Sequence, residues 1–234
     1  MNPLPAPRPT LVLMLLTGVF LSACNPAEKP EKTPAASEAP NADAFLILPG
    51  DYAAKTTVAD LEARFGAANV LRETVPEPQV VLFPEDPTRR AHIFFHDEEA
   101  FKDLARISVE DPGSLWRGKH GVHLGMTFAK VRELNGKPFY YDGFNGKKRA
   151  WVRDGWSPSL DDDDSTLGAF DTAENEHLYF EIEFGPDDTS QLKSGTDLPD
   201  DEYLLSDDPR FPRLGERILV TQMSAWNSLD DEWE

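Results

Sequence analysis

The sequence predicts an α+β fold in which two helix-plus-antiparallel-sheet repeats pack as one globular body, after a signal peptide and a disordered tether. Two observations support this fold class. A short helix pattern occurs twice, beginning at Thr57 and at Thr127, and strand-like segments follow each copy. In the clearest of these segments, residues 177–184, apolar and polar side chains alternate. Strands with one buried and one solvated face are typical of antiparallel sheets.

The repeated helix begins at a threonine and ends at a glycine in both copies. Thr57 leads to Gly66, and Thr127 leads to Gly136 at the same spacing. A threonine hydroxyl at the N-cap accepts a backbone N–H, and glycine suits the left-handed residue that follows a helix. Any short capped helix has this pattern, but equal offsets in two copies favour an internal duplication.

Strands are predicted wherever β-branched or aromatic residues recur with period two between turn residues. Because the predicted strands follow both helices, each repeat is expected to be a helix laid on one face of an antiparallel sheet. The expected strands are residues 80–83, 92–96 and 105–110 in the first repeat, and 150–152, 177–184 and 218–223 in the second.

The first part of the chain has the features of a secretory signal. Residues 11–20 form an apolar core that is too short to span a bilayer, and small residues follow it up to Cys24, the only cysteine. Such a segment is removed from the mature protein, so it does not contribute to the fold. Residues 21–24 (LSAC) also resemble the lipobox of bacterial lipoproteins. The alternative is an ordinary signal peptide with Cys24 near its cleavage site.

The lipobox resemblance implies cleavage before Cys24 and acylation of that residue, with palmitate among the chains attached. Asn25 stands where an aspartate in this family favours the inner membrane, so the resemblance implies an outer-membrane anchor. The residues that follow, up to Asp43, are rich in Pro, Ala, Glu and Lys without apolar periodicity. Such a composition is typical of a semi-extended tether.

The expected organisation therefore has five parts. The signal peptide comprises residues 1–23, and the lipidated tether comprises 24–43. The first repeat is expected at 44–112, the second at 113–228, and an acidic tail at 229–234.

The composition limits the possible partners and chemistry. The chain carries 23 Lys and Arg against 42 Asp and Glu, a formal net charge of −19. This acidity disfavours nucleic acid, because binding phosphates requires a basic surface. With Cys24 acylated, no thiol remains for a disulfide, a cysteine metal site or a cysteine nucleophile.

The second helix carries a more specific motif. Gly125-Met126-Thr127, Val131 and Gly136-Lys137-Pro138 resemble the helix–turn–strand signature of the SmpA/OmlA (BamE-like) outer-membrane lipoproteins. That family shares a small α+β shape with the β-lactamase-inhibitor-like fold, which is built from tandem helix-plus-sheet repeats. The first repeat lacks the Gly-Met and Pro of this motif, and Asn135 stands where the family usually has leucine. The resemblance implies a fold and a compartment, and it assigns no partner-binding residue.

The sequence predicts neither a metal site nor an enzyme. His92 and His96 share one predicted strand face, but four residues of strand separate them by about 13 Å, too far to share a metal. No serine lies in a nucleophile-elbow context, which disfavours a serine hydrolase. No catalytic residue, metal ligand or cofactor is expected. An acidic segment invites a calcium interpretation but lacks the order of an EF-hand loop, and a solvated loop is the alternative. Its carboxylates are Asp161–Asp164, Asp171, Glu174 and Glu176.

Aromatic residues are the stronger functional candidates. Tyr140, Tyr141, Phe144, Trp151 and Trp156 cluster after the second helix. Tyrosine and tryptophan combine apolar area with a polar group and are enriched at interfaces, so these five are the candidate partner-binding residues. The alternative is that about half of them fill the core under the sheet.

These features predict a non-catalytic, membrane-anchored periplasmic lipoprotein of the cell envelope. The expected localisation is an outer-membrane lipid anchor facing the periplasm, and the expected partner is an envelope protein rather than nucleic acid. The protein would act as a binding or scaffold module. The alternative function is an inhibitor or protective protein against an envelope-attacking enzyme such as lysozyme, whose basic surface would complement this acidic chain.

Overall fold

The structure is a computed structural model, and its described residues belong to one compact unit, Ala39–Glu234. The predicted signal peptide, Cys24, the tether, the acidic tail and most of the acidic segment lie outside the described residues. The described ranges are 46–144, 149–152, 156–159, 168–171, 178–186, 198–199 and 203–227.

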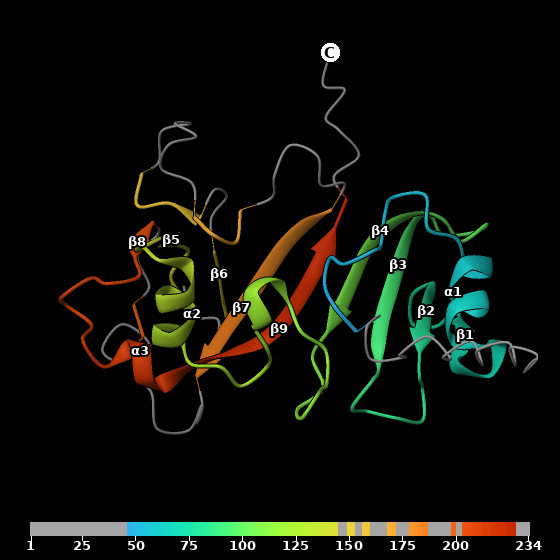
Figure 1. Cartoon of the computed structure of the whole chain (residues 1–234), viewed down its shortest axis with the longest axis horizontal. Coiled ribbons are helices and arrows are strands. Elements are labelled where there is room, and N and C mark those ends of the chain that lie inside the picture. Colours follow the sequence, from blue (N-terminus) through green and yellow to red (C-terminus); the bar gives the residue numbers. More distant parts are fainter. Residues whose placement is uncertain are drawn as a thin grey trace, which may run out of the picture. The chain divides into compact units, whose positions relative to one another are not determined.

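A seven-stranded antiparallel sheet forms the centre of this unit, in the order β1-β2-β3-β4-β9-β7-β6 (Figure 1). A small second sheet pairs β5 (Tyr140–Tyr141) with β8 (Leu204–Leu205). The α+β fold class is therefore confirmed, and each of the six predicted strands overlaps an observed one. The large sheet consists of β1 (Val70–Glu73), β2 (Gln79–Leu82), β3 (Ala91–Asp97), β4 (Lys102–Val109), β6 (Ala150–Trp151), β7 (Tyr179–Pro186) and β9 (Ile218–Trp226).

The strands of the two repeats follow one another outward in opposite directions from the central β4–β9 pair. In the first repeat, helix α1 (Val58–Phe65) precedes β1 to β4, which pair in sequence order. In the second, helix α2 (Phe128–Asn135) precedes β5, β6, β7 and β9, and Tyr141 of β5 forms an isolated bridge with Val152, the residue after β6. The last strand of each repeat, β4 and β9, pair with each other at the middle of the sheet. The second repeat adds β8 and the short helix α3 (Leu214–Arg217) before its last strand.

Both helices begin at the predicted threonines and end at the predicted glycines. Thr57 Oγ1 accepts the Asp60 N–H at 3.2 Å, and the Asp60 carboxylate accepts the Thr57 N–H at 2.9 Å, which completes a capping box. Hydrogen bonds from Thr57 hold the pKa of Asp60 below its ordinary value. At the second helix, Thr127 Oγ1 accepts the Lys130 N–H at 3.3 Å without a returning carboxylate. Gly136 adopts the left-handed conformation expected after a helix, with φ of 77°.

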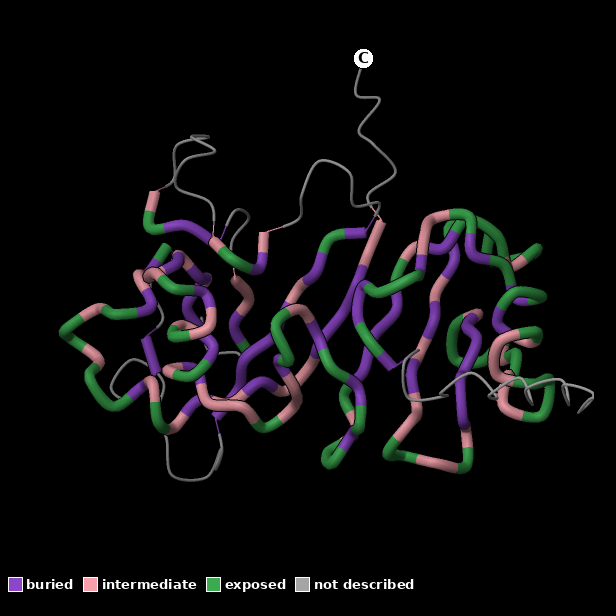
Figure 2. Tube along the Cα trace, in the orientation of Figure 1, coloured by how far each residue is buried: buried purple, intermediate pink, exposed green. Residues whose placement is uncertain are grey.

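One face of the sheet carries the core. Figure 2 shows buried and more exposed positions alternating along the long strands, as the sequence pattern predicts. In the second repeat, Phe128 on α2 packs edge-on against Phe184 of β7, with ring centroids 4.7 Å apart. In the first repeat, Val58 and Leu61 of α1 are buried in the same continuous core.

Between the helices, the chain segments that join the repeats cover the middle of this face. Trp116 is fully buried and donates its indole N–H to the Arg89 carbonyl at 2.8 Å. Gly118 lies so close to the sheet that a Cβ there would collide with the Phe180 ring. Residues 46–48 run alongside, since the Leu48 N–H donates to the Arg117 carbonyl. Two short 3-10 helices, η2 (Ala67–Asn69) and η3 (Lys119–Gly121), complete the described helical elements.

Candidate functional site

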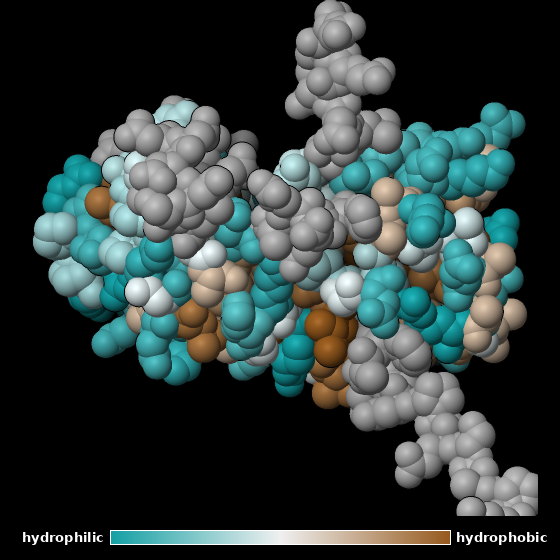
Figure 3. All heavy atoms as spheres, turned by 45° about the horizontal axis from the view of Figure 1, so that its top comes forward, coloured by the Kyte–Doolittle hydropathy of each residue, from teal (hydrophilic) through white to brown (hydrophobic). Residues whose placement is uncertain are grey.

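The opposite face of the large sheet carries no helix among the described elements. Side chains on this face belong to the alternate positions of the strands, and the strand registers place them in rows that cross the sheet. Successive rows lie two residues apart along each strand, or about 7 Å. Figure 3 is tilted by 45° from the view of Figure 1 and does not look straight onto this face; over the described surface that it shows, hydrophilic residues dominate and hydrophobic ones form small separate patches.

The first row joins aromatic side chains to an arginine. Phe94 of β3 pairs with Arg106 of β4, Arg106 pairs with Trp226 of β9, and Trp226 pairs with Tyr179 of β7. The Arg106 guanidinium lies 4.6 Å from the centre of the Phe94 ring, a cation–π contact. The Tyr179 and Trp226 rings are 5.1 Å apart, and Tyr179 is 45% exposed. We call these four residues the aromatic row.

The second row is polar and crosses the middle of the sheet. His92 of β3 pairs with Ser108 of β4, Ser108 with Ser224 of β9, and Ser224 with Glu181 of β7. Ser224 donates its hydroxyl to the Glu181 carboxylate at 3.3 Å, and His92 Nδ1 lies 2.9 Å from Gln79 Oε1. We call His92, Ser108, Ser224 and Glu181 the serine row. Its two central side chains are small, so the floor of the face is lowest where the repeats meet.

The third row contains a buried carboxylate. Glu183 of β7 pairs with Gln222 of β9 and with Trp151 of β6, and only 5% of Glu183 is exposed. Arg149 forms an ion pair with Glu183 at 3.0 Å, and the Thr221 hydroxyl donates to the same oxygen at 3.3 Å. Burial nevertheless raises the pKa of Glu183, and the nearby negative charge of Glu110 adds to this effect.

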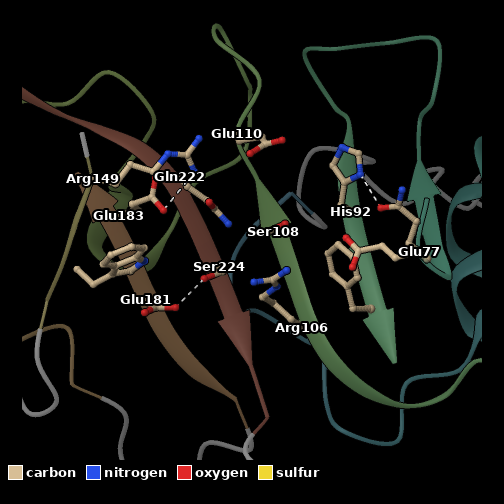
Figure 4. Close-up of a pocket in the computed structure, with 13 residues that line it drawn as sticks. Glu77, His92, Arg106, Ser108, Glu110, Arg149, Glu181, Glu183, Gln222 and Ser224 are labelled. Carbon is tan, nitrogen blue, oxygen red and sulfur yellow. Dashed lines mark hydrogen bonds and ion pairs between the residues drawn. The ribbon is translucent and has the colours of Figure 1, made fainter. Parts of the chain in front are cut away.

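These rows enclose a groove of about 460 Å³ that crosses the seam between the repeats. Figure 4 shows Ser108 and Ser224 in its middle, Glu110 and Arg149 toward one end, and Arg106 toward the other. Phe94 and Trp151 supply aromatic walls, whereas Tyr179 and Trp226 extend the aromatic row beyond the groove. The charged residues that line it are Glu77, Glu110, Glu181 and Glu183, against Arg106 and Arg149.

The five aromatic residues predicted to bind a partner have different environments. Tyr141, Phe144 and Trp156 are almost completely buried, so their predicted role in binding is corrected: they fill the core, where Tyr141 packs on Phe128. Tyr140 is half-buried in the small sheet, away from the groove. Only Trp151 both remains partly exposed and lines the groove.

Among the described residues, no group of three or more His, Cys, Asp or Glu side chains is arranged so that it could hold a metal ion. His92 and His96 lie on the same strand, with a register shift between Phe94 and Phe95 separating them. Asp171 is described, but the other acidic residues of the calcium interpretation lie outside the described residues. No described helix has the length and apolar character needed to cross a membrane.

The sequence contained a signal for the residues that were missed. Tyr179, Glu181 and Glu183 alternate with the buried residues of a predicted strand, so the period-two pattern already placed them on its solvated face. Phe94 and Arg106 follow the same rule on their strands. Which strands are neighbours determines which of these residues meet, and the sequence pattern does not contain that information.

No family model, curated protein or solved structure matches this chain.

Proposed function

We propose that this chain is a lipid-anchored protein of the bacterial envelope that binds a protein partner through the face of its large sheet opposite the core. We call this face the open face. It acts as a non-catalytic binding or scaffold module. Its lipobox, with Cys24 as the acylated residue, and its Pro-rich tether support the anchor, and the tether would hold the folded unit off the membrane.

The aromatic row is the observation that carries the binding function. A tryptophan, a tyrosine, a phenylalanine and an arginine lie side by side across four strands, on the face that no described helix covers. Trp, Tyr and Arg are the residues most enriched among those that dominate the affinity of protein interfaces. A sheet fixes their positions, so little conformational entropy is lost when a partner docks.

Site-specific photo-crosslinking in intact cells tests this function. A photoreactive amino acid at Tyr179 should form adducts with a distinct partner protein, because this position is 45% exposed at the edge of the aromatic row. Leu115 is a matched control, since it is 48% exposed but lies in the connection between the repeats. Failure to trap any protein at Tyr179, or identical adducts at both positions, would contradict the proposal.

Metabolic labelling tests the anchor separately. Radiolabelled palmitate should enter the wild-type chain and not the Cys24→Ala variant, because acylation requires the lipobox cysteine. Equal labelling of the two chains would show that the lipobox interpretation is wrong.

The acidic lining of the groove favours one second candidate, an inhibitor or protective protein against a basic envelope-attacking enzyme. Four glutamates and two arginines line the groove, and the whole chain carries a net charge of −19. Lysozyme activity measured with and without the purified protein separates this function from a scaffold role. Inhibition that is lost in Trp226→Ala would favour the inhibitor.

A further inference from the structure

The floor of the groove holds a polar side chain that the protein itself does not satisfy. Ser108 is 5% exposed and lies in the serine row between His92 and Ser224. Within the described part of the chain, its hydroxyl has no hydrogen-bond partner, whereas the Ser224 hydroxyl donates to Glu181. The hydroxyl is not one of the described side-chain atoms that are closed off from solvent without a partner, so it opens into the groove and is available to a bound group.

The charges around Ser108 define what that group would be. Glu110 follows two residues later on the same side and has no ion pair with any described residue. Glu181 lies across the seam, where it accepts the Ser224 hydroxyl, and Glu183 beyond it forms an ion pair with Arg149.

The remaining ionisable residues of the groove lie on the first repeat. Arg106 is held over the Phe94 ring, His92 contacts Gln79, and Glu77 lies at the same end. At the other end, Arg149 forms an ion pair with Glu183, so the charge that remains there is the negative charge of Glu110. A cation is the occupant that complements it.

We propose that the groove receives a lysine or arginine side chain from an extended segment of the partner, seated over Ser108 between Glu110 and Glu181. This inference rests on the proposed function, because it names the chemistry of the protein that would dock on the open face. The ammonium or guanidinium donates to the Ser108 hydroxyl and to the two carboxylates. Charge-assisted hydrogen bonds of this kind are the strongest available at an interface.

The spacing of the rows adds a feature of the partner sequence. Arg106, Ser108 and Glu110 are each two residues apart, or about 7 Å along the strand direction. An extended segment that runs parallel to this direction has the same repeat. Its basic residue and an apolar residue that covers Trp226 and Arg106 would therefore be two or four positions apart, on one face of the segment.

Selection from a linear dodecapeptide display library on the immobilised full-length protein tests this inference. The selected peptides should share a lysine or arginine two or four positions from an apolar residue. Their affinity should fall about tenfold or more in Glu110→Gln and Ser108→Val, which remove the carboxylate and fill the seat. Glu85→Gln is the matched control, since Glu85 is an exposed glutamate outside the groove.

The outcomes separate this inference from the proposed function. Peptides that require Trp226 but carry no basic residue, or that bind Glu110→Gln as well as the wild type, would overturn the inference and leave the docking face intact. A library that yields no groove-dependent peptide also overturns it, while the crosslink at Tyr179 still tests the function independently. Circular dichroism of each variant establishes that the substitution altered the binding position over Ser108 and not the fold.

Discussion

The two repeats share a backbone plan but differ in how their equivalent positions are filled. Both begin with a threonine-capped helix, and both place their last strand at the seam of the sheet. The first residue of the helix is Val58 in the first repeat and Phe128 in the second. The first helix is capped by the reciprocal bonds of Thr57 and Asp60, whereas the second is capped by Thr127 alone. The second repeat also contributes Glu183, the only buried charged residue in the described part of the chain.

This difference shows which parts of the plan are structural and which are available for function. Caps and strand pairings, which satisfy backbone groups, are common to both repeats. The side chains on the core face vary in size but remain apolar, and those on the open face vary in charge. A groove at the seam of two such repeats therefore carries different charged side chains at its two ends, even though equivalent strands flank it on both sides.

The largest expected effect concerns the first residue of each helix. Phe128→Ala should lower the free energy of unfolding by about 3–5 kcal/mol, because Phe128 packs against Phe139, Tyr141 and Phe184. Val58→Ala, at the equivalent position, should cost about 2 kcal/mol, since it removes fewer buried methyl groups. Urea denaturation measures both. Equal losses would show that the two helices contribute alike to the shared core.

A smaller effect is expected where the connection between the repeats crosses the core face. In Gly118→Ala, the added methyl group would collide with Phe180, and overpacking of this kind costs about 1–3 kcal/mol. Thermal unfolding of the variant gives the value. Recovery of stability in Gly118→Ala with Phe180→Leu would locate the collision, and no loss in the single variant would contradict the close approach.

The helix caps should differ by less. Thr57→Ala should cost about 1 kcal/mol or more, because it also releases Asp60 from the reciprocal capping bond. Thr127→Ala removes one bond, to the Lys130 N–H, and should cost less. Urea denaturation of the two variants side by side checks the order, and a larger loss at Thr127 would reverse this part of the comparison.

Glu183 should make stability depend on pH in the sense opposite to that of Asp60 in the first repeat, whose pKa is lowered. Its pKa is raised above the ordinary 4.5, so the folded chain takes up this proton at a higher pH than the unfolded chain. Its contribution to stability therefore grows as pH falls from neutral through the raised pKa, until the unfolded carboxyl is also protonated. The pH dependence of urea unfolding should lose this component in Glu183→Gln and retain it in Glu85→Gln.

The sequence was sufficient for the repeat, the helix caps and the long strands. Each of these depends on local chemistry: Thr57 and Thr127 cap their own helices, and period-two alternation fixes which side of β7 is buried. It was insufficient for the aromatic residues after α2. Tyr141, Phe144 and Trp156 occupy a stretch without clear periodicity. Tyr141 packs against Phe128 and Trp156 against Phe170, and both of these partners lie outside that stretch.

The groove itself was beyond local reasoning, because it exists only where β4 meets β9. Ser108 and Ser224 are far apart in the chain, and nothing in the pattern of either strand indicates that they pair. The short strands β5 and β8 were missed for a different reason, because two residues carry no periodic signal.

The pairing of β4 with β9 has a consequence for the origin of the chain. Two equivalent strands that pair antiparallel at the middle of a sheet are what an isologous homodimer of single repeats would present. Joining two such subunits into one chain converts a concentration-dependent assembly into an intramolecular one. The two repeats can then acquire different side chains independently of each other. A first repeat expressed alone would leave β4 as an unpaired edge, ready to bind a copy of itself.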